Sequence, residues 1–356
     1  MSRIAWFVSS HGFGHAARAS AVMGEWAIHW PDWEVELVSE SPSWFFEESL
    51  NLPFQLYHEK IDVGFVQRGP LQIDFAATVT QLQDFFDNLP SRVELLAQRL
   101  EGCQAVICDV APLGILVAKK LGIPSILIEN FTWDWLYREL ADRHPQLGEF
   151  ALPLEQIYAQ ADLRIQTRPF CHNHPQAPKV DPLARPLSPQ AHLLAQSLGL
   201  EGERPIITIT MGGHDFYPEF VEQLKKKEQY QFVLTGQGGS LRHQGNCLFL
   251  PPSSKVYHPD LINLSDGVIG KVGYSTMAEC HQAGTPFGYI ARMDFPESPL
   301  LCQFIETNMN GLALDPASFA LGGWLEELPL LLEQQSFGPG QGGRGEVVSL
   351  IESLLS

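Results

Sequence analysis

Short runs of β-branched and aromatic residues alternate along this chain with longer segments in which apolar residues recur every three or four positions. The first run covers residues 4–8. A glycine-rich loop follows, and the apolar positions 19, 22, 23 and 26 then form one face of an expected helix. Further strands are expected at 35–38, 105–108 and 125–128, and an amphipathic helix at 113–121 ends before Gly122 and Pro124. This βαβ order predicts a mostly parallel sheet.

The same alternation restarts in the second half of the chain. Strands are expected at 206–210, 231–236, 247–250, 268–269 and 287–290, and helices at 218–227, 274–282 and 347–355. Prolines crowd the segment 169–189, which predicts an extended linker. We therefore expect an α/β protein with a Rossmann-like domain at 1–168, a linker at 169–190, a second Rossmann-like domain at 191–345 and a C-terminal helix at 346–356.

Composition narrows the class of protein. With 356 residues and 45% hydrophobic content the chain can bury two cores of ordinary size. A net charge of −18 argues against a broad nucleic-acid-binding surface, so any bound anion must be held locally. The six cysteines show no paired short spacing, and we expect reduced thiols. Neither a secretory leader nor a membrane-spanning run is expected, which favours a cytoplasmic protein and leaves peripheral membrane contact open.

The segment 266–279 has the pattern of a buried strand, a glycine turn and the start of a helix. Gly270 and Gly273 permit a tight turn and the close approach of a ligand. The amides of Ser275 and Thr276 lie in the first helical turn, where the helix dipole favours phosphate, and Glu279 follows one turn later to accept from ribose hydroxyls. An ordinary strand-to-helix turn has the same pattern, so context must decide.

Longer strings give that context. The string from Gly270 to Glu279, the string from Arg292 to Ser298 and the two strings that begin at Asp109 and Asn130 closely resemble the glycosyltransferase-like N-terminal portion of plant L-arabinokinases. The loop 12–18 is similar to the glycine-histidine loop of the UDP-sugar hydrolase of pseudaminic acid synthesis and, more loosely, of the peptidoglycan N-acetylglucosaminyltransferase. The resemblance implies a GT-B fold, with two Rossmann-like domains and a cleft between them that holds a nucleotide sugar, which we expect to be a UDP-sugar. We expect no sugar-kinase domain in these 356 residues, so arabinokinase phosphorylation is not carried over.

The resemblance also implies catalytic groups. His15 begins the helix after the first strand, and the matching histidine of the similar families is the general base; histidine titrates near neutral pH, which suits this role. Asp109 ends another strand of the same sheet and either orients His15 or caps the helix at Pro112. His11 is a weaker rival for the base.

Two sets of binding residues complete the expectation. The acceptor side comprises His11, Arg18, Asn130, Trp133 and Asp134, with Trp133 either a flat face for a sugar ring or simple core. The donor side comprises Gly14, Gly212, Gly213, His214, Val256, Tyr257, Gly270, Gly273, Tyr274, Ser275, Thr276, Glu279, Arg292, Asp294 and Glu297. Lys271 is either a neighbour of the phosphates or an ordinary solvated lysine.

The run 171–174, Cys-His-Asn-His, packs three possible metal ligands together, but no second cluster completes a tetrahedral set, and we expect neither a metal nor a cofactor. The function expected is therefore metal-independent transfer of a sugar from a nucleotide sugar to an unidentified small-molecule acceptor. A nucleotide-sugar hydrolase, with His15 activating water, and a non-catalytic nucleotide-sugar sensor remain the alternatives.

Overall fold

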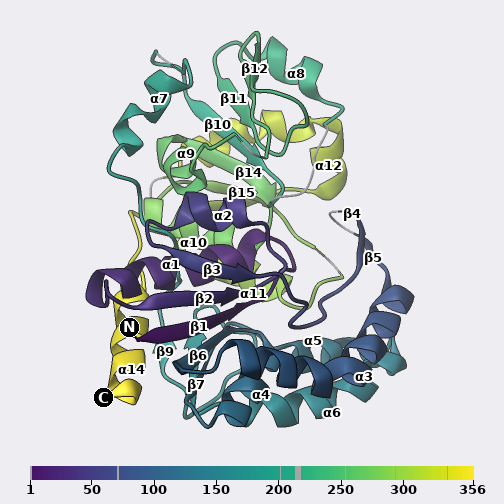
Figure 1. Ribbon diagram of the computed structural model, residues 1–356. Coiled ribbons are helices and arrows are strands. Elements are labelled where there is room, and N and C mark those ends of the chain that lie inside the picture. Colours follow the sequence, from purple (N-terminus) through teal and green to yellow (C-terminus); the bar gives the residue numbers. More distant parts are fainter. Residues whose placement is uncertain are drawn as a thin grey trace. The chain divides into compact units, whose positions relative to one another are not determined.

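The computed structural model describes residues 2–69, 72–200, 202–212, 218–252, 254–292, 294–334 and 336–356. The chain divides into two compact units, Met1–Leu183 with Gly342–Ser356, and Ala184–Gln341. The C-terminal helix therefore belongs to the first unit. In Figure 1 this helix, α14 (Arg344–Leu355), lies beside α1 (Phe13–His29).

The first unit is built on a seven-stranded parallel sheet of order β3-β2-β1-β6-β7-β8-β9. Its strands are β1 (Arg3–Val8), β2 (Glu34–Val38), β3 (Phe54–Tyr57), β6 (Cys103–Asp109), β7 (Ser125–Glu129), β8 (Leu163–Thr167) and β9 (Lys179–Val180). The short strands β4 (Gln67–Gly69) and β5 (Gln72–Ile73) form a separate pair. The remaining helices of the unit are α2 (Ser43–Ser49), α3 (Phe75–Arg99), α4 (Pro112–Leu121), α5 (Trp133–Leu140) and α6 (Pro145–Tyr158).

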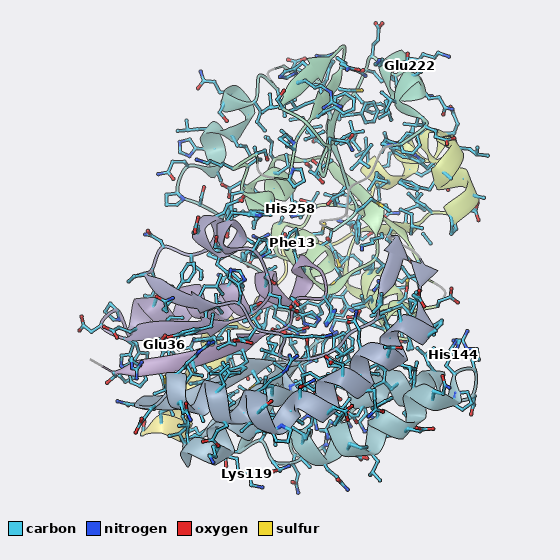
Figure 2. All side chains as sticks on the ribbon, turned by 45° about the vertical axis from the view of Figure 1, so that its right-hand side comes forward. Phe13, Glu36, Lys119, His144, Glu222 and His258 are labelled. Carbon is cyan, nitrogen blue, oxygen red and sulfur yellow. The ribbon has the colours of Figure 1, made fainter. Side chains whose placement is uncertain are left out.

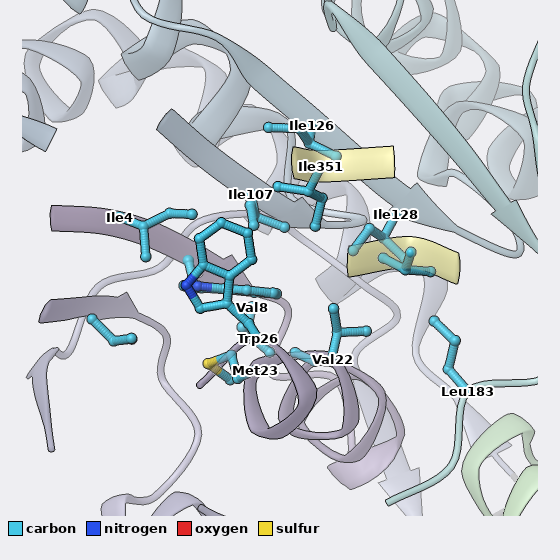
Figure 3. Packing of buried hydrophobic residues seen from close by; sticks show 14 of the residues in the cluster. Ile4, Val8, Val22, Met23, Trp26, Ile107, Ile126, Ile128, Leu183 and Ile351 are labelled. Atoms are coloured by element: carbon cyan, nitrogen blue, oxygen red, sulfur yellow. The ribbon is translucent and has the colours of Figure 1, made fainter. Parts of the chain in front are cut away.

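Helices cover both faces of this sheet. One face packs on α1, α2 and α14, and Figure 3 labels from this cluster Ile4, Val8, Val22, Met23, Trp26, Ile107, Ile126, Ile128, Leu183 and Ile351. On the other face α4 comes so close that a Cβ on Gly114 would lie 2.6 Å from the Cys108 sulfur. Strands buried on both faces explain the nearly continuous apolar runs in the sequence.

The second unit repeats this plan with a sheet of order β12-β13-β11-β10-β14-β15-β16, in which β12 is antiparallel to its neighbour. Its strands are β10 (Ile206–Thr210), β11 (Gln231–Leu234), β12 (Arg242–Gln244), β13 (Cys247–Phe249), β14 (Gly267–Lys271), β15 (Phe287–Ile290) and β16 (Gly311–Ala313). Its helices are η1 (Ala191–Leu193), α7 (Leu194–Ser197), α8 (Val221–Lys226), α9 (His258–Leu264), α10 (Tyr274–Ala283), α11 (Ser298–Asn308), α12 (Pro316–Leu321), η2 (Gly323–Glu326) and α13 (Leu328–Leu332).

The segment expected to be a linker, 169–190, is divided between the two units. Its strand β9 extends the first sheet beyond β8, with the pairs Gln166↔Lys179 and Thr167↔Val180. Its last residues belong to the second unit, where Arg185 is buried. The prolines around β9 are compatible with this arrangement, because β9 lies at the edge of the sheet and its open side needs no backbone N–H donor.

Candidate functional site

The strand order of the first unit reverses at β1, which pairs in parallel with β2 on one side and β6 on the other. In open parallel sheets, ligands bind beyond the carboxyl ends of the strands at such a switch point. Two of the expected catalytic residues lie there: α1 begins five residues after β1 and carries His15, and Asp109 ends β6 in register with Val8.

His15 and Asp109 are joined by a hydrogen bond of 2.8 Å between Nδ1 of the imidazole and Oδ1 of the carboxylate. Because an ionised carboxylate only accepts, this bond requires a proton on Nδ1. In the neutral imidazole Nε2 is then the acceptor nitrogen. The pair therefore has the arrangement of a general base whose tautomer is fixed by an acid.

Arg18, one turn further along α1, binds the same carboxylate through both of its oxygens, with Nε and Nη2 each 2.7 Å away. Its Nη1 also donates to Asn130. Arg18 and Asp109 are each 1% exposed and Asn130 is fully buried. In the structure Arg18, one of the residues expected on the acceptor side, binds Asp109, and Asn130, another of them, binds Arg18.

The charge of Asp109 is thus compensated inside the protein. Burial by itself raises the pKa of this carboxyl, but the charge of Arg18 and the hydrogen bonds from Arg18 and His15 outweigh it, so the pKa lies below its usual value. Asp109 is therefore an ionised acceptor at neutral pH, as a residue that orients an imidazole must be.

A second imidazole and carboxylate lie in the same unit. His11 Nε2 is 3.2 Å from Oδ1 of Asp62, and the same nitrogen accepts a hydrogen bond from the amide of Gly64 at 2.6 Å. Trp133 donates from Nε1 to Asp62 at 2.9 Å. Nε2 of His11 is thus already engaged by an amide, and a nitrogen so engaged is a poorer proton acceptor than one without such a donor.

Two more residues expected on the acceptor side are buried. Trp133 is 2% exposed and packs between both histidines, with ring centroids 5.2 Å from His11 and 6.2 Å from His15. Its indole therefore supports the two imidazoles and presents no open face to a sugar. Asp134 is 7% exposed, and one of its carboxylate oxygens lies 3.9 Å from Nη1 of Arg138.

In the second unit the strand order reverses at β10, which is flanked by β11 and β14. Gly212 follows β10 with a φ of 65°, a conformation that favours glycine. The expected neighbours Gly213 and His214 lie outside the described residues. Across the switch point the strand β14 leads through Gly273 into α10, the helix expected to hold the diphosphate.

The two glycines of this motif, Gly270 and Gly273, have different surroundings. A Cβ on Gly270 would lie 2.1 Å from the carbonyl oxygen of Thr210, so this glycine is needed for the pairing of β14 with β10. A Cβ on Gly273 would meet nothing within 4 Å. The absent side chain of Gly270 therefore makes room for a neighbouring strand, whereas the space beside Gly273 is open.

The first turn of α10 has no side-chain cap. Gly273 is its N-cap, and the first backbone bond within the helix runs from Met277 N to Gly273 O at 3.0 Å. The amides of Tyr274, Ser275 and Thr276 consequently precede the regular helical ladder, where a helix offers donors and a positive dipole end to an anion.

Glu279, expected to bind ribose, is 3% exposed and already has two side-chain partners. It accepts from Arg185 Nε at 2.9 Å, and its other oxygen is 2.9 Å from Nδ1 of His258, the first residue of α9, which Figure 2 labels. Burial raises the pKa of Glu279, but Arg185 and His258 outweigh this and hold it below its usual value. Neither partner was anticipated from the sequence.

The other donor-side residues lie on nearby loops of the same unit. Tyr257, the N-cap of α9, stacks under the Arg185 guanidinium at 5.2 Å, and Val256 precedes it. Arg292 follows β15, stacks on Phe295 at 3.9 Å and lies 3.9 Å from Glu297, while Asp294 is exposed. In the first unit Gly14 is the second residue of α1 and is partly exposed.

Three further expectations concern metal, thiols and membrane spans. Among the described residues no group of three or more acidic, histidine or cysteine side chains could hold a metal ion. His174 of the Cys-His-Asn-His run is fixed instead by the β8 residue Gln166, and burial lowers its pKa to about 4. The six cysteines are thiols, with no disulfide between any two of them. In the part of the chain that the structure covers, no helix is long and apolar enough to cross a bilayer.

Comparison with known proteins adds a family context. No protein-family model matches the chain. An L-arabinokinase of Arabidopsis thaliana is 24% identical over 358 aligned positions, which cover 98% of this chain but only 34% of that protein. The chain therefore spans about a third of the length of this relative.

Solved structures are similar over nearly the whole chain. The glycotransferase of kitacinnamycin matches with a TM-score of 0.62, 16% identity and 99% coverage of both chains. A UDP-glucosyltransferase from Polygonum tinctorium matches with a TM-score of 0.61, 15% identity and coverage of 99% of this chain and 93% of that one. These likenesses confirm that the chain has the α/β GT-B fold, with two Rossmann-like units.

Proposed function

We propose that this GT-B chain transfers a sugar from a nucleotide sugar, a UDP-sugar, to the hydroxyl of a small-molecule acceptor. The observation that carries the proposal is the pair His15 and Asp109 at the switch point of the first sheet, where the hydrogen bond on Nδ1 leaves Nε2 as the acceptor nitrogen. The uncapped first turn of α10 at the corresponding point of the second sheet supports the donor half.

In the proposed reaction His15 Nε2 removes the proton of the acceptor hydroxyl as its oxygen attacks the anomeric carbon of the donor. The bond from that carbon to the diphosphate oxygen breaks, and the nucleoside diphosphate leaves with the electron pair. Asp109 keeps the imidazole in the required tautomer and stabilises the imidazolium that forms. The amides of Ser275 and Thr276 stabilise the charge on the leaving diphosphate without a metal ion.

The UDP-glucosyltransferase from Polygonum tinctorium supports uridine as the base, since its name states the donor class of a protein with this fold. On the donor side we propose contacts from Gly273, Tyr274, Ser275 and Thr276 to the diphosphate. We place Asp294 and Glu297 near the sugar, Arg292 where the sugar meets the diphosphate, and Val256 and Tyr257 near the base. Glu279 can accept from a ribose hydroxyl only if its contact with His258 is broken, which frees one oxygen of the carboxylate.

The test begins with thermal-shift screening against nucleoside diphosphates and their sugars, because a ligand that binds the folded state raises its apparent stability. Release of nucleoside diphosphate from the selected donor is then measured with and without pooled acceptors. We expect His15→Ala to abolish release while donor binding persists, and His29→Ala, an exposed histidine at the other end of α1, to retain it. Turnover should survive EDTA.

The same assay separates the alternatives. Free sugar released at full rate without any acceptor would make the protein a hydrolase, and donor binding without release under any condition would make it a sensor. Unchanged turnover in His15→Ala would remove the imidazole from the mechanism.

A further inference from the structure

Two cationic side chains, those of Lys271 and Arg292, lie at the carboxyl edge of the second sheet. Lys271 is the last residue of β14 and is in register with Ile290, the last residue of β15; Arg292 follows two residues later. Both residues therefore lie at the carboxyl edge of the sheet, where β10 and β14 form the switch point. Lys271 precedes the first residue of α10, Tyr274, by three positions, and Arg292 lies on the loop after β15.

Lys271 is directed at the turn that follows β10. A Cβ on Gly212 would lie 3.1 Å from Cε of Lys271 and 3.8 Å from its Nζ. The end of the lysine side chain thus lies against the Gly212 backbone, and is not extended into solvent. The lysine is partly buried, so the alternative of an ordinary solvated lysine does not describe it.

Neither cation is well neutralised by the described residues. Lys271 has no carboxylate within ion-pair distance in that part of the chain, and Arg292 reaches only Glu297, at 3.9 Å. Nε of Arg292 is buried and has no hydrogen-bond partner among the described residues. The guanidinium is held in place instead by its stacking on Phe295.

This arrangement is electrostatically unfavourable when nothing is bound. Burial, together with the charge of Arg292, lowers the pKa of Lys271 to about 7. Two like charges withdrawn from water destabilise a fold unless an anion joins them. An anion of more than one negative charge would remove both the repulsion and the unsatisfied donors, and the uncapped start of α10 lies directly after Lys271 in the chain.

We propose that Lys271 and Arg292 form an anion-binding pair that grips the diphosphate of the donor. The proposal rests on the donor half of the proposed function and adds side-chain cations to the backbone amides of α10. The chain has a net charge of −18 and on the whole repels an anionic ligand, so a local pair of cations is needed to attract the diphosphate.

Binding should be coupled to proton uptake. A diphosphate beside Lys271 favours the ammonium form, so a lysine that is about half neutral near pH 7 takes up a proton when the ligand arrives. Among the described residues, the charge that acts on Lys271 is that of Arg292, on the loop after β15, and Arg292 in turn lies 3.9 Å from Glu297, at the start of α11. His214 and Asp215, outside the described residues, follow the Gly212 turn in sequence and are tested separately.

The experiment is isothermal titration of the full chain with UDP, inorganic pyrophosphate and uridine, at pH 7.5 in two buffers of different ionisation enthalpy. We expect Lys271→Met to weaken UDP and pyrophosphate by about 10-fold to 100-fold, as for the loss of a hydrogen bond to a charged group, and to leave the nucleoside unaffected. Lys226→Met, which changes an exposed lysine of α8, is the matched control.

Proton uptake provides a readout that a merely structural lysine would not change. It should be present in the parent, in His214→Ala and in Asp215→Asn, and absent in Lys271→Met. The parent should also bind UDP up to about tenfold more weakly at pH 8.5 than at pH 7.5, and Lys271→Met should show little change. Since methionine removes a buried charge, thermal unfolding should confirm that the variant remains folded.

Equal UDP affinity in the parent and Lys271→Met, or proton uptake that survives in Lys271→Met, would overturn the anion-binding pair while the proposed function stands. Pyrophosphate binding that depends on Lys271, in a protein that binds no nucleotide or nucleotide sugar, would support the pair and overturn the proposed function.

Discussion

Replacing Arg18 by methionine should destabilise the first unit strongly, although this arginine lies in a loop-and-helix segment that looks ligand-facing in the sequence. Arg18 is 1% exposed, and two of its nitrogens lie 2.7 Å from the two oxygens of Asp109, which is equally buried. Methionine keeps most of the aliphatic stem, so the packing loss is small and the lost charge dominates.

The magnitude follows from what is left behind. Removing one partner of a buried ion pair costs about 3–5 kcal/mol, because the remaining charge is desolvated without compensation. Arg168→Met is the matched control, since Arg168 also pairs with a carboxylate, that of Asp181 at 3.3 Å, but the two side chains are 47% and 44% exposed. A pair so open to solvent should contribute no more than about 1 kcal/mol.

The loss should depend on pH with a definite sign. In the parent the pKa of Asp109 is depressed, so its contribution is present above the unfolded pKa of about 4 and is lost as the pH falls through the folded value. Without Arg18, burial dominates and raises the pKa, so the variant is penalised at neutral pH and relieved as the carboxyl gains a proton. The difference between parent and variant should therefore shrink from pH 7 to pH 5.

Urea unfolding followed by tryptophan fluorescence is a suitable assay, because of the eight tryptophans only Trp324 lies in the second unit. The double variant Arg18→Met with Asp109→Asn should recover part of the loss, since no orphan carboxylate remains. A loss below about 1 kcal/mol at pH 7, a loss independent of pH, or a double variant less stable than Arg18→Met would refute the reasoning.

Two further changes test the second unit. Gly270→Ala should destabilise it by more than about 2 kcal/mol or prevent soluble expression, because the new Cβ would meet the Thr210 carbonyl oxygen. Gly273→Ala should fold normally and weaken UDP binding. Equal unfolding midpoints for the two variants would contradict the distinct roles assigned to the two glycines. Glu279→Gln should cost about 3 kcal/mol in urea unfolding, since Arg185 loses its buried carboxylate, and a cost near zero would show that the pair is dispensable.

Patterns that depend on local periodicity could be predicted from the sequence. The strand expected at 206–210 matches β10 residue for residue, and α10 extends one residue beyond the expected 274–282. The shared position of His15 and Asp109 could also be anticipated, because one follows a strand of the parallel sheet, the other ends a strand of it, and the carboxyl ends of such strands share an edge. Apolar periodicity and glycine turns reflect the conformation of the nearest few residues, and the strands and helices named here are determined by interactions over that short range.

Features that depend on partners distant in sequence could not be predicted in this way. Arg18 meets Asp109 across 91 positions and Arg185 meets Glu279 across 94, so neither pairing leaves a local pattern. Glycine also occurs in this motif for two different reasons that the sequence does not distinguish: Gly270 is required by a neighbouring strand, and Gly273 borders open space.

Val110, directly after Asp109, adopts a φ of 57° that a β-branched residue rarely takes, although glycine is the usual signal for this conformation. The fully buried Val110 receives hydrogen-bond support from Tyr158, whose hydroxyl donates to its carbonyl oxygen at 2.7 Å. The tertiary structure, and not the local sequence, therefore fixes the backbone beside the acid that orients His15.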